Sequence, residues 1–231
     1  MQYFKRMCGY FSRGEMILWS GSVLLIFVAF LLFDRENIMT LTASLIGVTS
    51  LIFNAKGNPF GQFLMVVFSI LYGVISYTFA YYGEMITYLG MTGPMAVFAL
   101  VSWLRNPYNG NRAEVRINQL RYREIVCMFL LAAVVTWIFY YILDAFHTTN
   151  LVPSLISVTT SFLAVYLTFR RSAFFALAYA ANDIVLIVLW MLAMRSDPSY
   201  LSVVVCFFMF LVNDLYGFVN WINMQKQQAN L

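Results

Sequence analysis

Charged side chains are scarce in this chain: lysine, arginine, aspartate and glutamate together make up 10% of its 231 residues. A soluble globular domain carries about 25% charged residues and about 45–50% apolar ones. Here 62% of the residues are hydrophobic and the mean hydropathy is +0.77, more apolar side chain than a water-soluble fold of this size can bury. These values exclude soluble enzymes and disordered proteins, so we expect the apolar surface to face lipid.

Residues that build disulfides, metal centres and catalytic sites are equally few. Cys8, Cys127 and Cys206 lie far apart with no Cys-x-x-Cys pair, so they form neither a disulfide framework nor a metal site. His147 is the only histidine, which excludes mechanisms that need two imidazoles. The sequence also lacks the GxSxG, HExxH and Walker motifs. We therefore expect no catalytic residue, no metal, no cofactor and no enzymatic activity.

Long hydrophobic runs dominate the sequence instead. About 20 apolar residues in a helix cross the ~30 Å hydrocarbon layer of a bilayer. The runs do not alternate between apolar and polar residues, as the strands of a membrane barrel do. The sequence therefore predicts an all-α integral membrane protein that contacts the lipid bilayer. The eight expected spans are residues 15–33, 39–55, 59–80, 85–104, 125–146, 151–169, 172–194 and 199–222.

Positive charge predicts the orientation of these spans. If the amino terminus is cytoplasmic, twelve of the fourteen lysine and arginine residues lie in inside segments, and only Arg35 and Arg195 lie outside. Basic residues concentrate on the cytoplasmic side of membrane proteins. The first apolar run has no small-residue cleavage pattern after it, so we expect a retained span and no cleaved signal peptide. Both termini are therefore expected in the cytoplasm, and the net charge of +4 reflects topology, with no nucleic-acid partner.

An internal repeat is visible in the sequence. Ser44–Ser50 (SLIGVTS) reappears as Ser154–Thr160 (SLISVTT), with five of seven positions identical. Ser-Trp-Leu around Trp103 and Asn-Trp-Ile around Trp221 then close the fourth and eighth spans. Four spans separate the copies, which gives both the same orientation, an arrangement of transporters with parallel repeats. We therefore expect two parallel three-helix repeats joined by a linker helix, plus one extra amino-terminal helix.

These boundaries divide the chain into six segments. The loop between the repeats is polar and basic, and its Asn-Pro-Tyr-Asn-Gly stretch is typical of a turn. The segments are 1–38 (amino-terminal segment and peripheral helix), 39–104 (first repeat), 105–124 (cytoplasmic loop), 125–148 (linker helix), 149–223 (second repeat) and 224–231 (cytoplasmic tail).

Ionisable residues at membrane depth are rare and functional by default. Asp183 lies in the middle of the seventh span and Asp214 in the eighth, each preceded by an asparagine, and no lysine or arginine lies inside any span. Tyr179 and Asp183 are four residues apart, so they share a helix face. Glu84 and Asp144 lie near span ends, where we expect solvent contact and a structural role. The two inner acids predict a binding or conduction site.

Asparagine and tyrosine supply hydrogen bonds and aromatic rings supply flat stacking surfaces, which suits an uncharged or cationic ring that carries a sugar. The candidate binding residues are Tyr72, Tyr88, Thr92, Tyr179, Asn182, Asp183, Asn213, Asp214, Tyr216 and Trp221. Alternative interpretations are that the polar residues only hold helices together, that the acids relay protons, that Pro94 only kinks its helix, and that Trp103 and Trp221 are interfacial anchors.

Over about residues 40–225 the sequence resembles PnuC-type vitamin transporters. The motifs that carry the resemblance are Tyr82-Gly83-Glu84, Pro94-Met95 and Trp103, followed by Asn182, Asn213, Tyr216-Gly217 and Trp221. The resemblance implies a fold related to SWEET sugar transporters, often trimeric, in a bacterial-type cytoplasmic (inner) membrane. It also implies facilitated diffusion of nicotinamide riboside, which a cytoplasmic kinase then traps by phosphorylation.

Departures from the family pattern leave the cargo open. The family often has tryptophans seven and four residues before Asn182, where this chain has Phe175 and Ala178, and a glutamine where it has Ala96. We expect a uniporter of a nucleoside-like molecule, with nicotinamide riboside as the first choice. A deoxynucleoside or thiamine is the alternative cargo, and a membrane scaffold without transport is a remote alternative that does not explain the unpaired acids.

Overall fold

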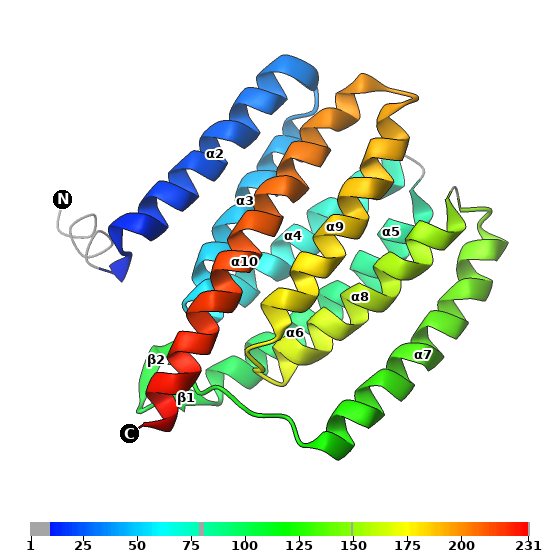
Figure 1. Cartoon of the computed structure of the whole chain (residues 1–231). Coiled ribbons are helices and arrows are strands. Elements are labelled where there is room, and N and C mark those ends of the chain that lie inside the picture. Colours follow the sequence, from blue (N-terminus) through cyan, green and yellow to red (C-terminus); the bar gives the residue numbers. More distant parts are fainter. Residues whose placement is uncertain (1–9, 79–80, 149, 231) are drawn as a thin grey trace.

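Long helices lying side by side dominate the computed structural model (Figure 1). The structure describes residues 10–78, 81–148 and 150–230, so Cys8 lies outside the described residues. The elements are α2 (Arg13–Phe33), α3 (Ile38–Ala55), α4 (Pro59–Thr78), α5 (Tyr82–Thr87), the π-helix η1 (Tyr88–Thr92), α6 (Gly93–Leu104), β1 (Pro107–Tyr108), β2 (Asn111–Val115), α7 (Tyr122–Ala145), α8 (Leu151–Phe169), α9 (Phe175–Met194), the 3₁₀-helix η2 (Pro198–Tyr200) and α10 (Leu201–Ala229).

The eight expected spans are confirmed. Within the described residues, eight helical segments are long and apolar enough to cross a membrane, with α5, η1 and α6 together forming the fourth. Several bounds differ from the prediction by a few residues, and two of these differences concern the fourth and the last span. The fourth span begins at Tyr82, because the Tyr82–Thr87 turn is already helical. The last helix continues to Ala229 through a polar stretch, because its Gln228 side chain is anchored by the backbone of Val115 and Ile117 in the loop that precedes α7.

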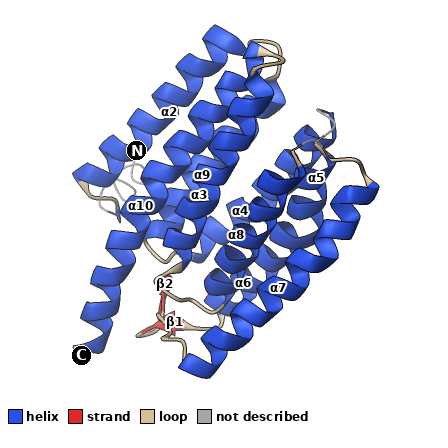
Figure 2. Ribbon diagram, turned by 45° about the vertical axis from the view of Figure 1, so that its right-hand side comes forward, coloured by secondary structure: helices blue, strands red, loops and turns tan. Residues whose placement is uncertain are grey.

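Six helices pack in a closed ring, each against the next: α3, α4, α6, α8, α9 and α10, with α10 returning to α3. Two helices lie outside this ring, α2 on α3 and α10, and α7 on α8 (Figures 1 and 2). Only 22% of the α2 span and 11% of the α7 span are buried, so both present apolar side chains outward, as helices in lipid do. The ring has α3, α4 and α6 in one half and α8, α9 and α10 in the other.

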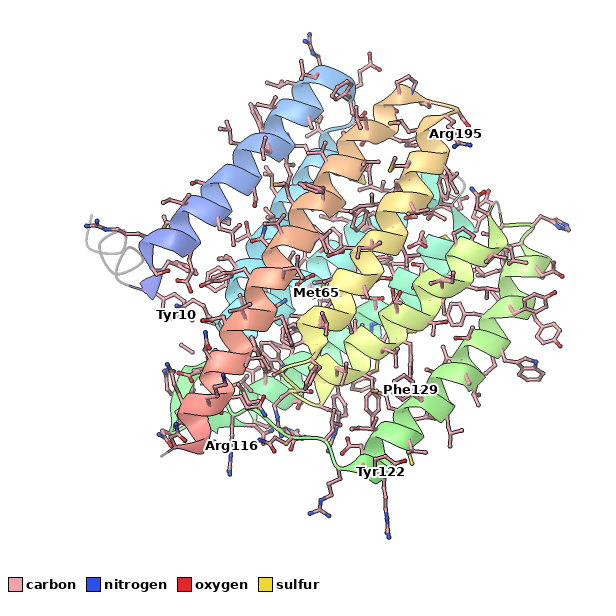
Figure 3. All side chains as sticks on the ribbon, in the orientation of Figure 1. Tyr10, Met65, Arg116, Tyr122, Phe129 and Arg195 are labelled. Atoms are coloured by element: carbon pink, nitrogen blue, oxygen red, sulfur yellow. The ribbon has the colours of Figure 1, made fainter. Side chains whose placement is uncertain are left out.

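The predicted loop between the repeats folds into a β-hairpin. Asn109 and Gly110 form its turn with φ of 46° and 77°, the left-handed values that a two-residue hairpin turn of this kind requires. The Val115 N–H donates to the Gly57 carbonyl at 2.9 Å, and Gln228 of α10 accepts from Ile117 at 2.8 Å. We call this end of the bundle the hairpin end; Figure 3 shows Arg116 there and Arg195 at the opposite end.

The fourth span changes its helical geometry in the middle. Its residues Tyr88–Thr92 form a π-helix, in which the Gly93 N–H donates to the Tyr88 carbonyl. Pro94 follows directly and has no N–H to donate to the preceding turn, which favours such a departure from the α-helix. Single π turns inside helices are frequent at functional sites. Two candidate binding residues, Tyr88 and Thr92, begin and end this segment.

Candidate functional site

The two acids that the sequence singles out face each other between α9 and α10. Asp183 is 3% exposed and Asp214 is 4% exposed, and their carboxyl groups lie within hydrogen-bonding range of each other. Neither ion pair found in the described part of the chain includes them. We call Asp183 and Asp214 the acid pair.

Tyrosines from both halves of the ring lie next to the acid pair. Tyr88 of η1 interacts electrostatically with Asp183, and Tyr179 of α9 interacts with both acids. Tyr88 also packs against Tyr72 of α4 with ring centroids 4.4 Å apart, and the Tyr72 hydroxyl accepts a hydrogen bond from Trp190 at 2.8 Å. Because Tyr88 comes from the opposite half, the acid pair faces the interior of the six-helix ring.

Asn182 is turned toward α8. Its Oδ1 accepts hydrogen bonds from Thr160 at 2.8 Å, Ser161 at 3.0 Å and Ser157 at 3.5 Å. An amide oxygen has two lone pairs, so these hydroxyls saturate it and fix the orientation of the side chain. Any contact of Asn182 with a cargo therefore uses its Nδ2 donors.

Asn213 and Tyr216 face α2 and lie apart from the acid pair. The Nδ2 of Asn213 donates to Ser22 of α2 at 2.9 Å and to the Met209 carbonyl at 2.8 Å, while its buried Oδ1 has no partner among the described residues. The Tyr216 hydroxyl donates to Glu15 of α2 at 2.9 Å. The structure thus brings together Tyr72, Tyr88, Tyr179, Asp183 and Asp214, and it places Asn213 and Tyr216 at the contact with the extra helix.

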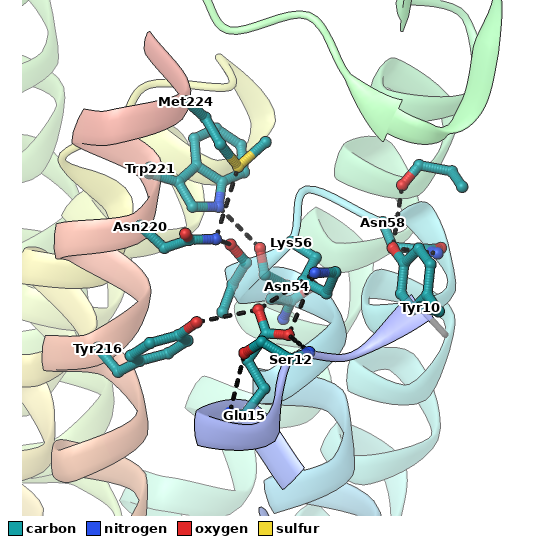
Figure 4. Close-up of polar contacts among 12 residues, drawn as sticks. Tyr10, Ser12, Glu15, Asn54, Lys56, Asn58, Tyr216, Asn220, Trp221 and Met224 are labelled. Carbon is teal, nitrogen blue, oxygen red and sulfur yellow. Dashed lines mark hydrogen bonds and ion pairs between the residues drawn. The ribbon is translucent and has the colours of Figure 1, made fainter. Parts of the chain in front are cut away.

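The contact of Tyr216 belongs to a polar cluster at the hairpin end (Figure 4). Glu15, 3% exposed, accepts from the Ser12 N–H at 2.6 Å, from Lys56 at 3.1 and 3.2 Å, and from Tyr216. Lys56 also lies 4.9 Å from the centroid of the Tyr10 ring. The cluster satisfies the charge of Glu15 and ties the start of α2 to the end of α3 and to the middle of α10.

Trp221 and Trp103 form a symmetrical contact between the two halves of the ring. The Trp221 Nε1 donates to the Asn54 carbonyl of α3 at 2.8 Å, and the Trp103 Nε1 donates to the Thr168 carbonyl of α8 at 2.9 Å. Their ring centroids are 5.3 Å apart, and both side chains are at most 1% exposed. The interpretation of these tryptophans as interfacial anchors is therefore wrong, because neither side chain reaches the membrane surface.

The residue before each tryptophan repeats the pattern. Asn220 donates to the Ala55 carbonyl at 2.8 Å, and Ser102 donates to the Phe169 carbonyl at 2.9 Å. The last carbonyls of a helix have no intrahelical partner, so each half of the ring caps the helix end of the other half. We call Ser102, Trp103, Asn220 and Trp221 the repeat clamp.

Glu84 is the functional candidate that the sequence interpretation missed. It is 1% exposed, and neither of its carboxyl oxygens has a hydrogen-bond partner of normal geometry among the described residues, although Ser157 of α8 is near. The expected solvent contact is therefore wrong. A signal was available, because Glu84 and Tyr88 are four residues apart on one helix face. Asp144, at the end of α7, is exposed as expected.

Two cavities differ in size and position. One of about 360 Å³ lies at the hairpin end, where Tyr10, Lys56, Glu114, Asn220 and Gln227 line it together with Asn111, Ala113 and Met224. The other, of about 10 Å³, lies between α3, α4 and α10 beside Tyr72 and has room for about one water. The side chains of α3, α4 and α10 beside Tyr72 therefore leave little free space between them in this conformation.

The chain is similar to known membrane transporters over nearly its whole length. Residues 37–223 match the protein family described as nicotinamide mononucleotide transporter. The nicotinamide riboside transporter PnuC of Neisseria mucosa is 26% identical over 227 residues, which cover 95% of this chain and 84% of that protein. A crystal structure of the vitamin B3 transporter PnuC has a TM-score of 0.82 at 22% identity and covers 94% of each chain, which shows a shared fold.

Proposed function

The chain belongs to the nicotinamide mononucleotide transporter (PnuC) family of membrane transporters, and we propose that its cargo is a nucleoside-like molecule, nicotinamide riboside. The observation that carries the proposal is the acid pair Asp183–Asp214, which faces the interior of the ring beside Tyr88 and Tyr179. Carboxyl groups accept hydrogen bonds from ribose hydroxyls, and tyrosine faces stack on a flat heterocycle. The named cargo of the Neisseria mucosa relative has both parts.

The binding residues follow from the positions of the candidate side chains. We place the cargo against Tyr72, Tyr88, Tyr179 and the acid pair, with the Nδ2 of Asn182 as a donor and Thr92, whose buried Oγ1 has no partner among the described residues, as a further polar contact. In this conformation Tyr216 and Trp221 use their polar atoms in contacts with α2 and α3, so we assign them an effect on the closed state and no direct contact with a bound cargo. Asn213 uses its Nδ2 in contacts with Ser22 and the Met209 carbonyl, which leaves only its Oδ1 to accept a hydrogen bond from a cargo.

Transport by this fold proceeds by alternating access. The repeat clamp closes the hairpin end by joining the two halves of the ring, and the two halves part there when the cargo leaves. The hairpin end is the cytoplasmic side, since Arg116 and Lys56 lie there and Arg195 lies at the other end. Both termini, in this orientation, lie in the cytoplasm of a bacterial-type inner membrane.

The energetic arrangement is uniport. The sequence has no nucleotide-binding motif to couple transport to ATP, so the cargo gradient sets net uptake and a cytoplasmic kinase sustains it by phosphorylating the cargo. A positively charged cargo gains about 2.3 kcal/mol per 100 mV of membrane potential, with no second ion. The largely exposed α7 and α2 spans offer surfaces for assembly into a homotrimer.

Counterflow in proteoliposomes tests the proposal. Vesicles preloaded with nicotinamide riboside should take up labelled nicotinamide riboside at full rate without sodium, a pH gradient or ATP. Asp183→Ala should weaken binding by about 5- to 150-fold, since an unpaired polar group costs about 1–3 kcal/mol. An absolute requirement for one of the three energy sources contradicts uniport. Uptake of thymidine or thiamine in place of nicotinamide riboside would select the alternative cargo, which the departures at Phe175 and Ala178 leave open.

A further inference from the structure

Three acids are buried inside the bundle, and none of them forms an ion pair with another described residue. Glu84, Asp183 and Asp214 are each at most 4% exposed, and the ion pairs in the described part of the chain, Lys56–Glu15 and Arg170–Glu124, involve other residues. No lysine or arginine lies in the interior of any span in the sequence. Helix packing by itself does not account for this set, because burying an uncompensated carboxyl group destabilises a fold.

The three acids form a connected series. Glu84 lies in the first turn of α5, at the end of the bundle opposite the hairpin, and Asp183 lies in the middle of α9. Tyr88 joins them, since it interacts electrostatically with both Glu84 and Asp183. Tyr72 also interacts with Glu84. The acids and the tyrosine faces thus alternate from the far end toward the centre of the ring.

Unpartnered oxygens mark this series as a binding surface. Both oxygens of Glu84 and the Oδ2 of Asp183 are buried and have no hydrogen-bond partner of normal geometry among the described residues. The other groups that face them are neutral or acidic. They are Ser157, Tyr72 and Tyr88 for Glu84, and Tyr88, Tyr179, Cys206 and Asp214 for Asp183. A ligand that brings a positive charge supplies what these side chains lack.

We infer that Glu84 and the Asp183–Asp214 pair are charge-selecting residues that favour a positively charged cargo over a neutral one of the same shape. The inference rests on the proposed function and adds a specificity-determining residue, Glu84, to it. A cation is attracted to carboxyl groups most strongly where water is excluded, and tyrosine faces add a cation–π attraction.

The test compares two forms of one molecule. Oxidised nicotinamide riboside has a cationic pyridinium ring, and its reduced dihydropyridine form has nearly the same shape and no charge. Binding to the purified protein and counterflow in proteoliposomes should favour the cationic form by at least about tenfold. Glu84→Gln should reduce this preference by about tenfold by weakening only the cationic form, whereas Glu84→Asp should keep most of it. The matched control is Asp144→Asn, which removes an exposed acid at the same end and should keep the full preference.

Each outcome decides the inference. Equal affinity of the unsubstituted protein for the two forms overturns it, and so does a wild-type preference in Glu84→Gln. If Glu84→Gln does not yield a monodisperse protein, the comparison of the two ligands on the unsubstituted protein and on Glu84→Asp still decides. Transport of thiamine, a cation, without nicotinamide riboside refutes the proposed cargo and supports charge selection, whereas transport of uncharged thymidine alone refutes both.

Discussion

Replacing Trp103 and Trp221 by phenylalanine should open the hairpin end of the transporter. Each tryptophan donates from its indole N–H to a carbonyl at the end of a helix in the other half of the ring, at 2.9 and 2.8 Å. Phenylalanine keeps most of the buried ring and removes the donor. The conformation in which the halves are joined should lose stability relative to one in which they part, with little change in the packing within each half.

The structure sets the size of this effect. The Thr168 carbonyl also accepts from the Arg171 N–H at 3.0 Å, and the Asn54 carbonyl also accepts from the Gly57 N–H at 2.9 Å. Neither carbonyl is left without a partner, so each substitution removes about 1 kcal/mol, the net value of one hydrogen bond, and avoids the larger cost of an orphaned group. The double variant should shift the closed-to-open equilibrium by about 2 kcal/mol, or about 30-fold.

Cysteine labelling measures the shift. Ala176 of α9 belongs to the same buried cluster as Trp103 and Trp221. Ala180 is 2% exposed and lies one helical turn farther from the hairpin end. In a background without the native cysteines, Ala180→Cys should react with a maleimide about 5-fold faster in each single variant and about 30-fold faster in the double variant. Trp137→Phe is the control, since Trp137 is 63% exposed on α7. Unchanged labelling in the double variant, or equal acceleration by the control, refutes the role of the clamp.

Two further predictions concern packing and topology. Gly61→Ala should destabilise the protein by about 3 kcal/mol, because the new Cβ would lie 2.7 Å from a backbone nitrogen of α3. Gly21→Ala is the control and should be neutral or stabilising, since nothing lies within 4 Å of its Cβ position. Thermal unfolding in detergent compares the two variants, and an equal loss of stability in both contradicts the packing argument. If the hairpin end is cytoplasmic, a cysteine at Asn109 in the hairpin turn should resist an impermeant thiol reagent added to whole cells, and a cysteine at exposed His147 should react. The reverse pattern refutes this orientation.

The membrane fold was predictable because the signals for spans are strong and local. Run length and charge predicted the eight helices, and the Asn-Pro-Tyr-Asn-Gly stretch predicted the turn that the hairpin makes at Asn109 and Gly110. The closed ring of six helices could not be predicted from the sequence in the same way, since it depends on contacts between helices far apart in the chain. The π-helix at Tyr88–Thr92 was anticipated only as a kink at Pro94, because a proline removes a hydrogen bond without specifying which helical geometry replaces it.

The repeat shows how sequence similarity and structural equivalence separate. The heptapeptide that suggests the repeat ends at Ser50 in one copy and at Thr160 in the other. The equivalent clamp carbonyls are those of Asn54, four residues later, and Thr168, eight residues later. One helix therefore reaches the clamp one turn after its heptapeptide and the other two turns after. The symmetry of the clamp supports the predicted repeat, and it rests on the Ser-Trp and Asn-Trp sequences, since the heptapeptides are offset by a turn.

Glu84 could not be placed from span position alone. A residue near the end of a span reaches solvent only if its side chain is on the lipid or loop side, and helical periodicity gives a face without stating what that face contacts. The missing information is that α5 and η1 pack against α8, which turns the face shared by Glu84 and Tyr88 toward Ser157 and the interior. An acid that lies four residues from a predicted site residue, as Glu84 does from Tyr88, shares a helix face with that residue. This spacing is better evidence that the acid faces the interior than its distance from the end of the span. The same spacing does not predict whether Asp144 is buried, because the residues four positions away, Tyr140 and Thr148, are not predicted site residues. Its exposure follows only from the position of α7 outside the ring.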